Sequence, residues 1–137
     1  MGRILLSYGC TVGLVILLDV LWLSVMMPVL YKPRMAHLLA DHMVYAAAPV
    51  FYLLYAFGLY WFVISPSQGE SNWLAIFATG ALFGLVAYGT YDLTNQVTLR
   101  GWPVIITIID LVWGGAMAGI VCVLAVFLTT KIFTVFN

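Results

Sequence analysis

Four long apolar segments dominate this 137-residue chain and constrain its fold more than any other feature of the sequence. They cover residues 4–27, 43–64, 73–95 and 104–130. A helix needs about 20 mainly apolar residues to cross the hydrocarbon of a bilayer. An α-helix also satisfies its own backbone polar groups there, where water is absent. The sequence therefore predicts an all-α membrane protein whose four transmembrane helices form an antiparallel bundle with short loops.

The composition supports this class and argues against others. Hydrophobic residues make up 65% of the chain and charged residues only 7%, whereas a soluble domain carries roughly 25% charged residues. The formal net charge is zero and no basic patch is present, which argues against nucleic acid as a partner. Nothing outside the four segments is large enough to fold alone, so residues 1–137 are expected to form a single domain.

The connections between the segments differ in character. Residues 65–72 read as a surface loop in which Ser71 or Asn72 caps the third helix. In the longest connection, residues 31–42, the apolar Met35, Leu38 and Leu39 suggest a short helix at the membrane interface. The few Lys and Arg residues are divided almost evenly between the two sides, so the sequence leaves the orientation open.

Three aspartates lie inside the apolar segments: Asp19, Asp92 and Asp110. Each costs about 2.5–3.5 kcal/mol at the centre of a membrane helix, so such residues usually have a use. Because consecutive helices alternate in direction, a rise of about 1.5 Å per residue places all three within roughly 15 Å of the same membrane surface. The opposite half of the spans contains no Asp, Glu, Lys, Arg or His. The common depth indicates a site near one membrane face.

Helical spacing groups further side chains with these carboxylates, because residues three, four and seven apart share a helix face. In the third segment Gly80 and Gly84 precede the polar residues on one face, and we expect them to allow a close helix contact. The candidate ligand-binding residues from all four segments are Asp19, Trp22, Tyr45, Tyr52, Tyr88, Asp92, Asn95, Asp110 and Trp113. We expect these faces to turn into the bundle.

Two short stretches also match each other. Residues 17–22 read Leu-Leu-Asp-Val-Leu-Trp and residues 108–113 read Ile-Ile-Asp-Leu-Val-Trp. Because the first and fourth helices run in opposite directions, the two stretches would face each other at similar depth, as inverted repeats do around transporter sites. The match is only six residues long and its apolar positions are common in membranes, so chance or convergent packing is the competing explanation.

One extended pattern resembles a known family. Residues 84–95 (GLVAYGTYDLTN), 98–103 (TLRGWP) and 110–114 (DLVWG) are similar to a family of small bacterial inner-membrane proteins of unknown function, and residues 19–22 and 51–55 fit as well. The likeness covers nearly the whole chain. It implies a four-helix protein of the bacterial inner (cytoplasmic) membrane and implies no activity.

Three functions remain open. A pocket between the helices would bind or transport a small amphipathic or cationic ligand, or protons, with aspartates as counter-charges and aromatic walls. The alternative is an accessory or assembly subunit, in which the polar groups serve helix packing, a role worth under about 2 kcal/mol per hydrogen bond. A lipid-modifying enzyme would use Asp92 or Asp110 as general acid or base, but no second catalytic group is evident, so a non-enzymatic role is favoured.

No cofactor is expected from the sequence. His37, Asp41 and His42 are metal ligands by type, but the set is incomplete and lies near a membrane surface, so no metal site is expected. The expected partners are membrane lipids, with a membrane-protein partner or a second copy of the chain as further candidates.

Overall fold

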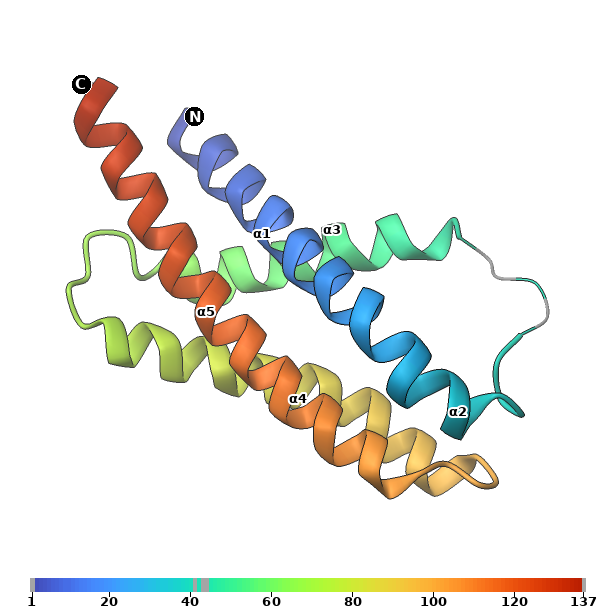
Figure 1. Ribbon diagram of the computed structural model, residues 1–137. Helices are drawn as coiled ribbons and strands as arrows, with labels where there is room; N and C mark the ends of the chain where they lie inside the picture. Colours follow the sequence, from blue (N-terminus) through green and yellow to red (C-terminus); the bar gives the residue numbers. More distant parts are fainter. Residues whose placement is uncertain (1, 41, 43–44, 137) are drawn as a thin grey trace.

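The computed structural model describes residues 2–40, 42 and 45–136, with side chains as far as residue 132. Its elements are α1 (Gly2–Met26), η1 (Met27–Tyr31), α2 (Lys32–Met35), α3 (Ala47–Leu59), η2 (Tyr60–Ile64), α4 (Trp73–Thr98) and α5 (Val104–Phe136) (Figure 1). The first three form one continuous helix, as do α3 and η2. Four helices in the described chain thus have the length and composition to cross a membrane, which confirms the expected fold.

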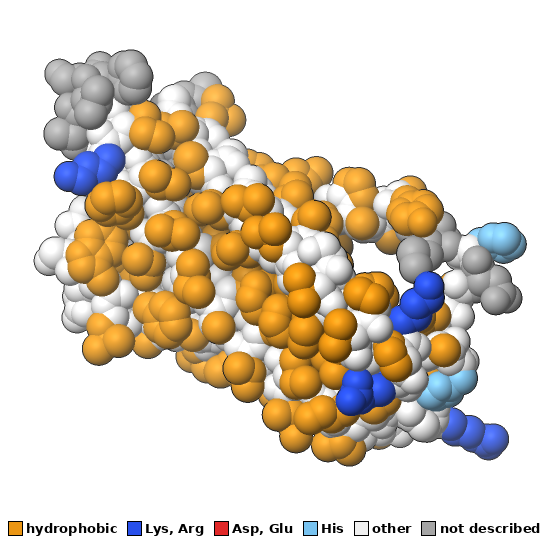
Figure 2. Space-filling view, in the orientation of Figure 1, with side chains coloured by type: hydrophobic (Ala, Val, Ile, Leu, Met, Phe, Trp, Pro, Cys, Tyr) orange, Lys and Arg blue, Asp and Glu red, His pale blue; other side chains and the backbone are white. Residues whose placement is uncertain are grey.

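The four helices are not packed equally. α1 and α5 run antiparallel with both chain ends at the same side, and α4 and α5 form an antiparallel hairpin (Figure 1). α3 packs on α1 and touches α4 through Tyr55, but the second spanning helix approaches α4 and α5 mainly at η2. Residues 47–51 are consequently exposed at the start of α3. Apolar side chains cover the middle of the visible face and Lys and Arg side chains lie towards its ends, as a bilayer requires (Figure 2).

The first helix is longer than the sequence predicts. We expected it to end near residue 27, just before Pro28, a residue that lacks an N–H group and whose ring interferes with the preceding turn. The chain instead widens into a π-helical turn, in which the backbone N–H of Lys32 donates to the carbonyl of Met27 five residues earlier. Such single π turns accommodate an interruption without ending a helix. The helix continues to Met35.

The prediction of a short interfacial helix that contains Met35, Leu38 and Leu39 is therefore wrong. Met35 ends α2, and the backbone N–H groups of Leu38 and Leu39 both donate to its carbonyl oxygen in a turn. The second spanning helix was expected to begin at Met43, which lies outside the described residues; α3 begins at Ala47.

The α4–α5 hairpin is the closest-packed part of the fold, and glycines make it possible. A Cβ atom at Gly84 would lie 2.1 Å from the carbonyl oxygen of Gly114, and one at Gly80 would lie 2.9 Å from that of Ala118. Neither distance leaves room for a side chain, so the two backbones touch directly. The expected close helix contact at Gly80 and Gly84 is confirmed.

Side-chain hydrogen bonds fix both ends of this hairpin. Oδ1 of Asn72 accepts a hydrogen bond from the backbone N–H of Ala75 at 3.1 Å, which confirms one of the two expected caps of α4. At the other end the indole N–H of Trp102 donates to Oγ1 of Thr107 at 3.0 Å. That hydroxyl donates in turn to Oε1 of Gln96 at 2.9 Å. The network holds together the end of the hairpin that carries Asp92 and Asp110.

Candidate functional site

A cavity of about 570 Å³ lies between α1, η1, α3, α4 and α5. All three membrane aspartates line it, and each is buried: Asp19 is 8% exposed, Asp92 0% and Asp110 7%. The expectation that they turn into the bundle is confirmed. The complete lining comprises Asp19, Trp22, Leu23, Tyr31, Phe51, Tyr55, Ala87, Tyr88, Tyr91, Asp92, Asp110 and Trp113.

Asp19 is satisfied from α3. The hydroxyl group of Tyr52 donates to Oδ2 of Asp19 with an oxygen–oxygen distance of 2.5 Å, which is typical of a strong hydrogen bond to a carboxylate. This bond links α3 to α1 close to the point where the start of α3 leaves the bundle. The Asp19 carboxylate thus has a structural partner.

Asp110 is satisfied by a chain of two hydrogen bonds. The hydroxyl of Tyr31 donates to Oδ1 of Asp110 and accepts from the indole N–H of Trp22 at 3.0 Å. The sequence did not predict a role for Tyr31, because it follows Pro28 and was placed outside the first helix. On a regular α-helix it would also lie about half a turn away from Trp22. The π turn at η1 adds the rotation that brings the two side chains together.

Asp92 differs from the other two aspartates. Both of its carboxylate oxygens are buried, and no described residue donates a hydrogen bond to either of them. Two donors in the same lining are also buried and unpaired: the hydroxyl of Tyr55 and the indole N–H of Trp113. An unsatisfied buried polar group is costly, and a buried charge more so. The cavity therefore presents one open acceptor group and two open donors.

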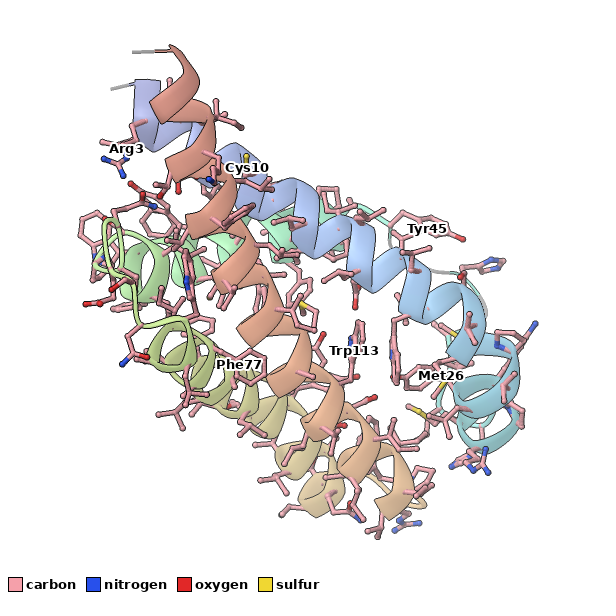
Figure 3. The ribbon with its side chains drawn as sticks, turned by 60° about the vertical axis from the view of Figure 1, so that its left-hand side comes forward. Arg3, Cys10, Met26, Tyr45, Phe77 and Trp113 are labelled. Atoms are coloured by element: carbon pink, nitrogen blue, oxygen red, sulfur yellow. The ribbon has the colours of Figure 1, made fainter. Side chains whose placement is uncertain are left out.

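The two matching stretches of α1 and α5 face each other across this cavity. The rings of Trp22 and Trp113 stack in parallel, with centroids 4.2 Å apart and an interplanar angle of 7°. Figure 3 shows Trp113 between α5 and α1. The aspartate of each stretch accepts a hydrogen bond from a tyrosine of another segment. The two stretches thus lie opposite each other, but their contacts are not equivalent. Tyr31 belongs to the continuation of α1 and also accepts from Trp22, whereas the indole N–H of Trp113 has no acceptor among the described residues.

Comparison with known proteins identifies the family. The family described as Predicted membrane protein (DUF2177) matches residues 4–127, which is most of the chain. The chain belongs to this family. Together with the four spanning helices, the match shows a multi-pass membrane protein. No match was found among curated proteins or among solved structures.

The structure brings most of the predicted side chains of this family member together. Besides the three aspartates, Trp22, Tyr88 and Trp113 line the cavity. Tyr52 reaches it through its hydrogen bond to Asp19. Asn95 is half-buried on α4, one turn beyond Asp92 and outside the lining.

Tyr45 is the predicted residue that the structure places elsewhere. Its side chain is 76% exposed and lies near the start of α3, away from Trp113 (Figure 3). The prediction assumed a helix in which Tyr45 shares a face with Tyr52. The helix begins only at Ala47, so Tyr45 belongs to the preceding turn and is not oriented by that spacing.

The sequence analysis did not predict several of the residues that line the cavity. Tyr55 follows Tyr52 by three residues and is only 6% exposed, so helical spacing alone could have found it. Tyr91 directly precedes Asp92, and adjacent residues on a helix point about 100° apart. Helical spacing therefore did not place Tyr91 on the face of Asp92, but the cavity is wide enough for both residues to line it. The remaining missed residues are Leu23, Tyr31, Phe51 and Ala87.

The metal-type residues of the first connection do not add to the site. His37 and His42 are both exposed. Asp41, the third residue of that set, lies outside the described residues.

Proposed function

We propose that the protein binds a small amphipathic ligand whose cationic, hydrogen-bond-donating group contacts Asp92. The observation that carries this proposal is the fully buried Asp92 carboxylate without an internal donor in the wall of the cavity. A carboxylate in this position is costly until a cation or a proton neutralises it. A ligand with an ammonium group would supply both the charge and the donors.

The rest of the cavity suits such a ligand. Its volume of about 570 Å³ falls in the range of small-molecule sites, roughly 300–1,000 Å³. Aromatic side chains on five elements, among them Trp22, Phe51, Tyr88 and Trp113, form apolar walls and provide ring faces that attract cations. Asp19 and Asp110 add negative potential while their tyrosine partners hold them in place.

The alternatives predict a different pattern of hydrogen bonds. If the aspartates served only to hold helices together in an accessory subunit, each would have a partner within the fold. Asp19 and Asp110 meet that expectation and Asp92 does not. Transport of the ligand or of protons through the same cavity is the second candidate, favoured by the three buried carboxylates that line it.

The resemblance noted in the sequence supports a location for this activity. We place the protein in the cytoplasmic membrane of a bacterium, with membrane lipids around its four spans. A second copy or another membrane protein as partner remains part of this proposal.

Ligand-induced thermal stabilisation in detergent tests the proposal. The probe is phenethylamine, which combines an ammonium group with an aromatic ring, and the neutral control is phenethyl alcohol. At a concentration of 100 times Kd, binding stabilises a protein by about 2.7 kcal/mol, so we expect the amine to raise Tm and the alcohol to have little effect. Asp92→Asn should abolish the stabilisation.

The matched control is Glu70→Gln, the same carboxyl-to-amide change in the exposed loop before α4. It should respond to the amine as the unmodified protein does. Equal stabilisation of the Asp92→Asn variant, or none in any form of the protein, would overturn the proposal.

A further inference from the structure

A second, apolar space adjoins the cavity. It is a groove of about 240 Å³ lined by Trp22, Ile108, Ile109, Val112, Trp113 and Ala116. Trp22 and Trp113 line both spaces. The stacked pair of indole rings therefore forms the partition between the aspartate cavity and the groove.

The groove opens towards the bilayer. The side chains of Ile108 and Val112 are 54% and 67% exposed on the surface of α5, where the hydrocarbon of the membrane surrounds a spanning helix. Asp110, which lies between them in the sequence, points instead into the cavity. One turn of α5 thus presents a carboxylate on one side and a lipid-facing apolar groove on the other.

The two indole rings of the partition differ in their hydrogen bonds. The indole N–H of Trp22 donates to Tyr31, which is itself bonded to Asp110. The indole N–H of Trp113 is buried and has no acceptor among the described residues. A change in the rotamer of Trp113 would therefore break its stacking on Trp22 but no hydrogen bond.

We propose that the ligand is a single-chain amphiphile with a primary-amine head, which binds with its head at Asp92 and its alkyl tail beside Trp22 and Trp113 in the groove. The proposal rests on the proposed function and specifies its ligand. The head follows from the unpartnered carboxylate, and the tail follows from an apolar groove that shares two residues with the cavity. The small volume of the groove suits an alkyl chain.

Photo-crosslinking in lipid nanodiscs tests the position of the tail. The probe is a long-chain primary amine with a photoreactive group near the end of its chain, and the matched control is the corresponding long-chain alcohol. We expect the amine to label the peptide that contains Ile108, Val112 and Ala116. Asp92→Asn, or the alcohol in place of the amine, should lower this labelling about tenfold, as expected for loss of a hydrogen bond to a charged group.

A substitution that fills the groove gives the second arm. Ala116→Phe adds a ring within the groove, and Ile120→Phe adds one a turn further along α5, outside it. The first variant should lose most of the labelling by the long-chain amine and keep its stabilisation by phenethylamine. The second should behave as the unmodified protein in both assays.

The outcomes separate this inference from the proposed function. If phenethylamine stabilisation depends on Asp92 but labelling is unchanged in Ala116→Phe, the tail does not occupy the groove and the inference is overturned while the proposed function stands. If neither phenethylamine stabilisation nor long-chain labelling depends on Asp92, both are overturned.

Discussion

A single methyl group added at Gly84 should separate the two most closely packed helices. The Cβ atom of Gly84→Ala would lie 2.1 Å from the carbonyl oxygen of Gly114 and 2.7 Å from Cβ of Ala118. Ordinary contacts of this kind begin at 3.4 Å. Because the obstacle at Gly114 is backbone, no side-chain rotation can relieve it, and α4 and α5 must move apart by roughly 1 Å in a tightly packed interior.

The cost of this movement can be estimated. Overpacking of a close-packed contact costs about 1–3 kcal/mol. Replacing a helical glycine by alanine returns up to about 1 kcal/mol through the helix propensity of the chain. We therefore expect Gly84→Ala to lower the free energy of unfolding by about 1–2 kcal/mol, and Tm in detergent by several degrees, measured by circular dichroism.

Gly89→Ala is the matched control on the same helix. A Cβ atom there would meet only Cδ1 of Leu93, at 3.8 Å, which is ordinary contact. This variant should be as stable as the unmodified protein or slightly more so. If Gly84→Ala unfolds at the same temperature as Gly89→Ala or above it, the direct backbone contact between α4 and α5 is wrong.

Two further substitutions test individual hydrogen bonds. Trp102→Phe removes the buried indole N–H that donates to Thr107, and should lower the free energy of unfolding by about 1 kcal/mol in thermal or denaturant unfolding. The control Trp61→Phe changes a side chain that is 59% exposed and should have no measurable effect. Equal stabilities of the two variants would contradict the hydrogen-bond network at the α4–α5 turn. Tyr52→Phe leaves Asp19 without its donor and should lower the free energy of unfolding by up to about 2 kcal/mol. Asp19→Asn should then cost much less stability in the Tyr52→Phe variant than in the unmodified protein. Additive effects of the two substitutions would show that the two side chains do not interact.

The inward direction of the aspartates could be predicted from sequence alone. Counting residues from the ends of the apolar segments placed Asp19, Asp92 and Asp110 near one surface, and the cost of a carboxylate in hydrocarbon required them to turn inward. All three are buried in one cavity. The glycines Gly80 and Gly84 were equally readable, because a side chain is absent where two membrane helices must touch.

The partners of the aspartates could not be predicted, since they depend on local departures from regular helix geometry. Tyr31 reaches Asp110 because a π turn follows Met26 and changes the direction in which the following side chains point. Spacing rules assume 3.6 residues per turn throughout and miss such rotations. Tyr45 shows the opposite error, because its predicted role required helix where the structure has a turn. Among the described residues, Asp92 is the one membrane aspartate of the three without a donor, and helical spacing gave no sign of this difference.

Native mass spectrometry of the protein, released gently from the membranes in which it is made, tests the central claim most directly. We expect a small molecule to remain bound to the unmodified protein and to Glu70→Gln, and the same mass to be missing from Asp92→Asn. The variants share the carboxyl-to-amide change and differ in whether it lies in the cavity or in the loop before α4. An unmodified protein without such a mass, or an Asp92→Asn variant that retains it, would contradict a ligand site at Asp92.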